Sequence, residues 1–178
     1  MDKKFRLLIE LGAGEFEHVD GSLIAHLEGT RCLLKEWNAS QVLQDAGLYH
    51  AAYGTSAFAQ NLFELAQREE VATVIGSEIE NIVYHYCACD RDAFFTQFGK
   101  VDKPIFYNRI TTQRSAISSE LLQQLCELSA ANETEIAINN SDFVVQHGDE
   151  LLDLFSRMQS FLSLSAQRKI QHVFASHL

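Results

Sequence analysis

Proline is almost absent from this chain of 178 residues. It occurs once, at Pro104, and glycine is concentrated in the first hundred residues. Because so few helix breakers interrupt segments with hydrophobic residues spaced three and four apart, the sequence predicts an all-α fold. Long hydrophobic runs are missing too, and every apolar stretch is far shorter than the roughly 20 residues that cross a bilayer. We therefore expect no membrane association.

Clusters of basic residues are also lacking. The 14 lysines and arginines are scattered, and 24 acidic residues give a formal net charge of −10. Binding to duplex nucleic acid needs clustered cations that replace condensed counterions, so no nucleic-acid partner is expected. One pocket can still be locally positive on an acidic protein. The expected partner is a small-molecule ligand, and homodimerisation stays open.

Cysteine is sparse and poorly spaced for metal binding. Cys87-Ala-Cys89 lacks the spacing of a zinc knuckle, and no second pair accompanies it. We expect the four cysteines to be free thiols, as in a reducing compartment. The first ten residues are too interrupted by charge for a secretory signal. The sequence therefore predicts a cytoplasmic protein.

Length and composition predict one domain over residues 1–178, because a chain of this size with 47% hydrophobic residues can bury a proper core. The segment 104–114 is rich in β-branched and aromatic residues, which favours a short extended arm or hairpin on the helical body. Residues 142–147 are expected to be irregular. Helices are expected at about 2–11, 22–37, 41–53, 57–65, 68–74, 78–87, 118–140, 148–161 and 165–177.

Histidines in the first third of the chain carry the candidate chemistry. His26 lies at the edge of the apolar stripe of one expected helix, and His50 lies in the last turn of the next. A short turn at residues 38–40 favours antiparallel helices whose imidazoles can face each other. Such a pair can bind a divalent metal or act as acid and base. Alternatively, each imidazole makes one buried hydrogen bond and nothing else.

The order of these motifs resembles the HD-domain metal-dependent phosphohydrolases, above all the stringent-response alarmone hydrolases. Those enzymes carry a histidine, a His-Asp doublet on a later helix and a distant aspartate. The corresponding stretches here are His26, Ala46-Gly47-Leu48-Tyr49-His50 and Leu128-Ser129-Ala130-Ala131-Asn132, and the resemblance covers residues 18 to 140. The chain is still more similar to an uncharacterised bacterial family in which His-x-x-Tyr-Gly-Thr replaces the doublet. The resemblance implies an HD-like helical bundle.

Two departures from the HD pattern affect the metal site. Ala51 stands in place of the aspartate of the doublet, and Asn132 in place of the distant aspartate. By resemblance the metal ligands are His26, His50 and Asn132, and His18, in the loop before its helix, could add a third nitrogen. Two imidazoles and one amide bind hard Mg²⁺ or Mn²⁺ poorly and suit Fe²⁺, Zn²⁺ or Ni²⁺ better. The expected cofactor is one divalent transition metal, Fe, Zn or Mn, with no nucleotide cofactor.

Catalysis is assigned to His50 and Tyr53. Tyr53 could donate a proton or orient a substrate, or it could be a core residue with a solvated hydroxyl. Asn132-Glu133-x-Glu135 could place a carboxylate near the pocket, although its two glutamates project to different faces. The substrate pocket is expected to be lined by Ser22, Thr55, Arg68 and Glu78. Alternatively, Arg68 forms an ion pair on the surface. Glu78 or Glu80 could likewise only stabilise the start of a helix through its dipole.

Two functional hypotheses result. The first is a divergent HD-like metal-dependent enzyme that acts on a small metabolite, phosphorylated or not, as a hydrolase or, with iron bound, as an oxygenase. The second is a metal-free, degenerate HD-like domain that binds a small molecule or a protein partner. A metal-free acid–base enzyme that uses His50 and Tyr53 lies between the two.

Overall fold

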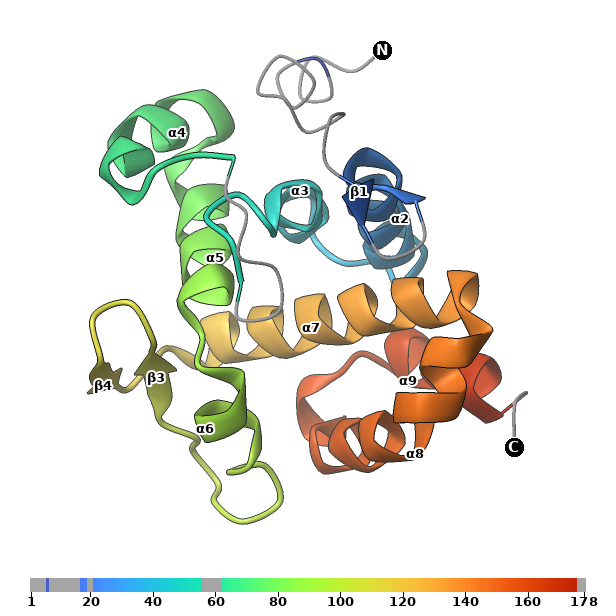
Figure 1. The fold of residues 1–178 in the computed structure, drawn as a ribbon. Helices are drawn as coiled ribbons and strands as arrows, with labels where there is room; N and C mark the ends of the chain where they lie inside the picture. Colours follow the sequence, from blue (N-terminus) through green and yellow to red (C-terminus); the bar gives the residue numbers. More distant parts are fainter. Residues whose placement is uncertain (1–5, 7–16, 19–20, 56–61, 176–178) are drawn as a thin grey trace.

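A long helix, α7, runs through the middle of the molecule and has other helices on both sides (Figure 1). The structure is a computed structural model that describes residues 6, 17–18, 21–55 and 62–175. Helix α7 spans Ser119–Asn139, and the Ser118 side chain caps it by accepting a hydrogen bond from the Leu121 amide. It contacts most of the other helices. Because α7 is buried on several faces, it is the scaffold of the fold.

Helices α2, Leu23–Glu36, and α3, Gln41–Tyr49, lie side by side against one flank of α7 (Figure 1). Asn38 makes the sharp turn between them with a positive φ of 59°, which asparagine tolerates better than most residues. At Gly47 a β-carbon would lie only 2.7 Å from Leu34 Cδ1. The glycine therefore allows α2 and α3, the helix pair that the short turn predicted, to pack closely.

Four helices, the first of them a single short turn, follow at one end of α7. Helix η2, Leu65–Gln67, leads into α4, Arg68–Ile75, and Gly76 then reverses the chain with a φ of 100°. Helix α5, Ser77–Ala88, packs on α3, α4 and α7. The short α6, Arg91–Phe95, comes next, with the Asp90 side chain as its N-cap.

Two small hairpins complete this half of the chain. Strand β1, Glu17–His18, pairs with β2, Gly21–Ser22, directly before α2. Strand β3, Phe106–Asn108, pairs antiparallel with β4, Gln113–Ser115. The second hairpin confirms the extended segment that was predicted for residues 104–114.

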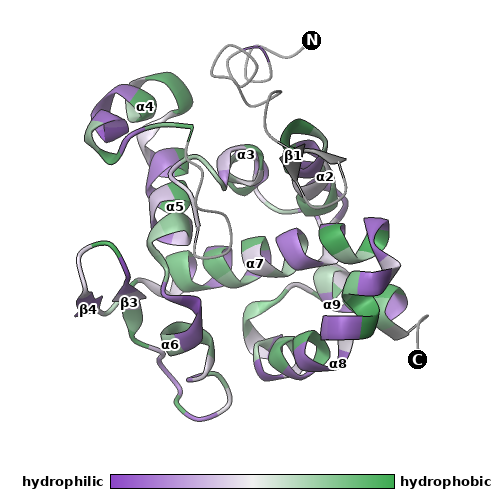
Figure 2. Cartoon of the chain, viewed as in Figure 1, coloured by the Kyte–Doolittle hydropathy of each residue, from purple (hydrophilic) through white to green (hydrophobic). Residues whose placement is uncertain are grey.

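The last helices cover the opposite flank of α7. They are α8, Ser141–Arg157, the short η3, Gln159–Phe161, and α9, Leu164–Ala175 (Figure 1). Figure 2 shows hydrophobic and hydrophilic residues alternating along α8 and α9, as expected for helices with one buried face. In the described part of the chain, no helix is long and apolar enough to cross a membrane.

The predicted all-α single domain is confirmed: the described residues form eight α-helices around one core, with small hairpins beside it. Several element boundaries were wrong. Residues 142–147 are helical rather than irregular, because the Asn140 side chain accepts a hydrogen bond from the Phe143 amide and starts α8 there. Residues 21–22 pair with β1 and do not begin a helix.

The helix predicted for residues 41–53 was also too long. It ends at Tyr49, because tight turns follow in which the amides of Ala52 and Gly54 bond to carbonyls three residues back. Of the helix predicted for 57–65, residues 62–64 are not helical, and its earlier part lies outside the described residues. The helix predicted for residues 2–11 also lies outside them, apart from Arg6.

We expect Gly47→Ala to lower the free energy of unfolding by about 1–2 kcal/mol. Overpacking against the fully buried Leu34 costs about 1–3 kcal/mol, and the higher helix propensity of alanine returns up to about 1 kcal/mol. Urea denaturation measures the change. Gly148→Ala in α8 is the matched control, because its β-carbon would lie 3.3 Å from the Val144 side chain. This variant should be neutral or slightly stabilised, and an equal loss in both would contradict the packing argument.

Candidate functional site

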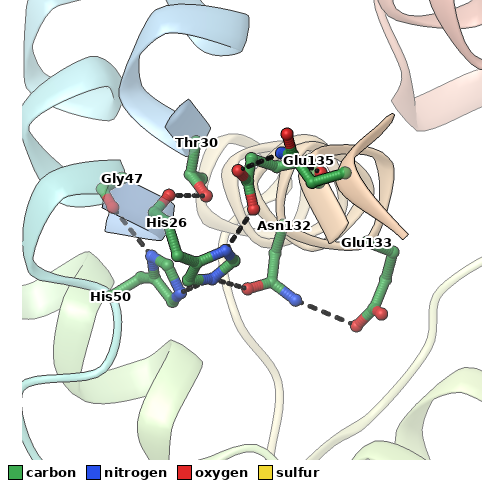
Figure 3. A network of polar contacts seen from close by, with 8 residues as sticks. His26, Thr30, Gly47, His50, Asn132, Glu133 and Glu135 are labelled. Carbon is green, nitrogen blue, oxygen red and sulfur yellow. Dashed lines mark hydrogen bonds and ion pairs between the residues drawn. The ribbon is translucent and has the colours of Figure 1, made fainter. Parts of the chain in front are cut away.

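Three of the four residues predicted as metal ligands meet where α2, α3 and α7 come together (Figure 3). His26 Nε2 lies 3.3 Å from His50 Nε2 and 3.0 Å from Asn132 Oδ1. The two imidazole rings are nearly perpendicular, with centroids 5.1 Å apart. All three side chains are buried, with relative exposures of 6%, 3% and 7% for His26, His50 and Asn132.

The outer nitrogen of each imidazole has a partner that can only accept a hydrogen bond. His26 Nδ1 contacts the carboxylate of Glu135, which also accepts a bond of 2.7 Å from Asn139 Nδ2. His50 Nδ1 donates to the carbonyl oxygen of Gly47 at 2.7 Å. Both Nδ1 atoms therefore carry a proton. In the neutral form of each ring, the lone pair is then on Nε2, which faces the centre.

The orientation of the Asn132 amide follows from its neighbour Glu133. Asn132 Nδ2 donates to Glu133 Oε1 at 3.1 Å, and a carboxylate accepts this bond but cannot donate one (Figure 3). The carbonyl oxygen of the amide is therefore turned towards His26. His50 Nε2 and Asn132 Oδ1 thus both turn a lone pair towards His26 Nε2, an arrangement that a cation stabilises.

A chain of contacts closes around this centre on the side of Glu133. Arg91 donates to Glu133 at 2.9 Å and also to the Tyr86 hydroxyl. The Tyr86 ring meets His50 edge to face, with centroids 5.4 Å apart. Burial raises the pKa of the Tyr86 phenol, so this group stays neutral. This series of side-chain contacts runs from His50 through Tyr86, Arg91 and Glu133 to Asn132. It therefore connects His50 and Asn132, the two residues that face His26 Nε2.

The opposite side of the centre depends on a glycine. A β-carbon at Gly29 would lie 2.7 Å from Glu135 Oε1, so only glycine at this position lets Glu135 reach His26 across α2 and α7. Asn132 and Glu135 are three residues apart on α7 and therefore share one face of the helix. Within α2, the Thr30 hydroxyl donates to the His26 carbonyl at 3.0 Å.

Tyr53 and Arg68 belong to a second cluster, built on the buried Glu80. The Tyr53 hydroxyl donates to Glu80 at 3.1 Å, and Arg68 binds both carboxylate oxygens, at 2.6 and 2.9 Å. The Arg68 guanidinium also lies 3.4 Å above the Tyr84 ring. Burial, followed by the negative charge of Glu80, raises the pKa of the Tyr53 phenol. Tyr53 is therefore a protonated donor held by a carboxylate.

The remaining predicted pocket residues are spread over the fold. Thr55 is buried after the turn that follows α3, whereas Glu78 is exposed in the first turn of α5. Of the two glutamates considered there, Glu80 is the buried one. His18 and Ser22 lie in β1 and β2, and their side chains fall outside the described part of the structure.

Several neighbours of the centre were not predicted from the sequence. Gly29, Tyr86 and Arg91 belong to no recognisable motif, and Arg91 lies 42 residues before its partner Glu133. Gly47 lies in the stretch that ends at His50, but its carbonyl was not predicted to accept a hydrogen bond from that histidine. The two glutamates after Asn132 did carry a signal. They flank it on different sides, as their spacing indicated, with one on the amide nitrogen and the other on His26 (Figure 3).

Metal-ligand chemistry at this centre would depend on an amide oxygen. Among the described residues, no group of three or more His, Cys, Asp or Glu side chains is arranged to hold a metal ion. The centre has two imidazoles and an amide as inner groups, and its carboxylates contact the outer atoms. It can therefore bind either a proton or a cation that accepts neutral donors.

Comparison with known proteins finds a family model that matches part of the chain. No curated protein and no solved structure matches it. The family match has no stated function and shows no link to the HD-domain enzymes, so that resemblance stays a prediction. Asn132, Glu133 and Glu135 of α7 lie beyond the matched range. Residues 7–91, which supply both histidines of the centre, match a domain of unknown function, DUF6817.

Proposed function

We propose that His26, His50 and Asn132 hold one divalent transition metal in a divergent HD-like enzyme that acts on a small metabolite. The observation that carries the proposal is the approach of two buried acceptor atoms, His50 Nε2 and Asn132 Oδ1, to a third, His26 Nε2. Zinc–nitrogen bonds of about 2.0–2.1 Å at a tetrahedral centre place two nitrogens about 3.3 Å apart. The two Nε2 atoms have this separation, 3.3 Å.

The outer partners also support a metal centre. Histidines that bind metals usually donate their second ring nitrogen to a carboxylate or a backbone carbonyl, which fixes the ring and its tautomer. His26 and His50 have one partner of each kind, Glu135 and Gly47. Glu133 fixes the Asn132 amide in the same way. Because the inner ligands are neutral, the positive charge of the metal ion would be balanced by the carboxylates of Glu133 and Glu135.

Neutral nitrogen ligands favour Fe²⁺ or Zn²⁺ over Mg²⁺. Three protein ligands leave a position for water or substrate, and a bound metal supplies Lewis-acid activation of that water, or oxygen chemistry if it is iron. The role of this chain is to orient the two imidazoles and the amide and to shield them from bulk solvent. The proposal is therefore a hydrolase, or an oxygenase with iron bound, for a small metabolite that is phosphorylated or not.

The 3.0 Å contact of His26 Nε2 with Asn132 Oδ1 favours the metal-free alternative. With a proton on Nε2, His26 would donate to Asn132 Oδ1 and His50 Nε2, and the Glu135 carboxylate at Nδ1 would balance the charge of the imidazolium. The same three residues would then form a buried polar network without metal. This network suits a degenerate HD-like domain that binds a small molecule or a protein partner.

Metal analysis of the purified protein tests the proposal. We expect about one Zn²⁺ or Fe²⁺ per chain, and near-zero metal in His26→Ala and His50→Ala, because each variant removes one of the three ligands. The control is His172→Ala on the exposed surface of α9, which should keep the metal. Metal at 100 times its Kd should stabilise the wild type by about 2.7 kcal/mol. Metal-free protein that takes up neither ion and shows no thermal shift would refute the proposal.

The variant Asn132→Asp distinguishes a centre that binds a metal from one that binds only a proton. The variant loses the hydrogen bond to Glu133 and places two carboxylates side by side, so without metal it should be less stable by about 1–3 kcal/mol. With Zn²⁺ its affinity should rise on the order of tenfold, because ligand charge strengthens metal sites. Isothermal titration calorimetry measures that affinity.

The matched control for this variant is Asn139→Asp. Asn139 Nδ2 donates to the carboxylate of Glu135 at 2.7 Å and to its backbone carbonyl at 2.9 Å, so the replacement also removes an amide–carboxylate hydrogen bond and adds the same charge. It is not an inner ligand of the centre and should not bind Zn²⁺ more tightly. If both variants respond to Zn²⁺ alike, or if neither does, position 132 is not a metal ligand.

A further inference from the structure

A cavity of about 300 Å³ opens between α6, α7 and α8. Its walls include Phe95, Phe143, Leu151 and Leu154, all large apolar side chains that are only partly buried. Cavities of this volume with mainly apolar walls and a few polar groups are typical of small-molecule sites. The apolar walls therefore fit a ligand with a small hydrophobic body, such as a benzene ring.

The two arginines that line the cavity are already paired. Arg91 is bound to Glu133, which lines the same cavity. Arg157 forms an ion pair with Asp153 and also donates to the carbonyl oxygens of Phe95 and Phe98. Neither arginine therefore provides an unbalanced positive charge for an anionic ligand.

Two carboxylates at the cavity are not balanced. Asp92 of α6 and Glu150 of α8 are exposed, and neither has an ion pair in the described part of the chain. Phe95 and Phe143 add aromatic faces, which attract cations. The chain as a whole carries a net charge of −10. The electrostatics of the cavity thus favour a positively charged group next to a hydrophobic body.

We infer that this cavity binds a small organic cation of the arylalkylamine class. The aromatic body lies among Phe95, Phe143, Leu151 and Leu154, and the ammonium group faces Asp92 and Glu150. This site is separate from the histidine centre and needs no metal. It is nevertheless close to that centre, because Glu133 lines the cavity and also accepts the hydrogen bond from Asn132.

The test uses three probes of similar size and different charge: 2-phenylethylamine, 2-phenylethanol and 3-phenylpropionate. Each is titrated at neutral pH into the full chain with ¹³C-labelled leucine methyl groups. We expect the amine to shift the Leu151 and Leu154 methyl signals at the lowest concentration, the alcohol to bind at least about threefold more weakly, and the propionate to bind most weakly. Each exposed ion pair of this kind raises the binding affinity about 1.5- to 5-fold.

The double variant Asp92→Asn/Glu150→Gln tests the charge selection. It should weaken amine binding by about 3- to 10-fold and change alcohol binding by less than twofold, since only the ammonium group faces the carboxylates. The control is Glu69→Gln/Glu70→Gln in the exposed first turn of α4, which changes the net charge equally and should leave amine binding unchanged.

Four results would overturn the inference. The first is that no probe shifts the two methyl signals, which would exclude a site for this class. The second is that the propionate binds as tightly as the amine. The third is equal binding of amine and alcohol to the wild type, and the fourth is an equal loss of amine affinity in both double variants. The last two would leave an apolar cavity without a site for a cation.

Discussion

The meeting of three hydrogen-bond acceptors in a buried place is the constraint on which this structure depends. His26, His50 and Asn132 come from α2, from the end of α3 and from α7, so their contact brings three helices together. Buried lone pairs that face one another repel and have lost their water, which costs free energy unless a cation lies between them. A proton or a metal ion supplies that charge. The identity of the cation decides between the two proposed functions.

Buried carboxylates with hydrogen-bond or ion-pair partners also occur elsewhere in the core. Glu135 and Glu133 flank the centre, Glu80 is bound by Arg68 and Tyr53, and Glu127 accepts two bonds from Ser163 at the start of α9. Each of these buried or partly buried groups links parts of the chain that are distant in sequence. Removing one partner leaves a buried charge or donor without its partner. This costs more free energy than the intact pair contributes to stability. The helices are thus joined by polar contacts as well as by hydrophobic packing.

The histidine centre and the cavity between α6, α7 and α8 share one residue. Glu133 accepts from Asn132 on one side and from Arg91 on the other, and it lines the cavity. Any ligand that changes the Arg91–Glu133 pair would therefore act on the amide that faces His26. The family match ends at Arg91, so the histidines lie inside it and the α7 residues that complete the centre lie outside.

The sequence by itself determined the helical class, an extended arm or hairpin near residues 104–114 and the possible pairing of His26 with His50. These features depend on local periodicity, turn residues and a short connection, which neighbouring residues specify. Tertiary structure alone decided the rest. The contact of His26 Nδ1 with Glu135 and that of Arg91 with Glu133 join residues 109 and 42 positions apart. The end of α3 at Tyr49 likewise precedes turns that leave His50 beside His26 of α2. No local pattern encodes such contacts, because they exist only after the helices have packed.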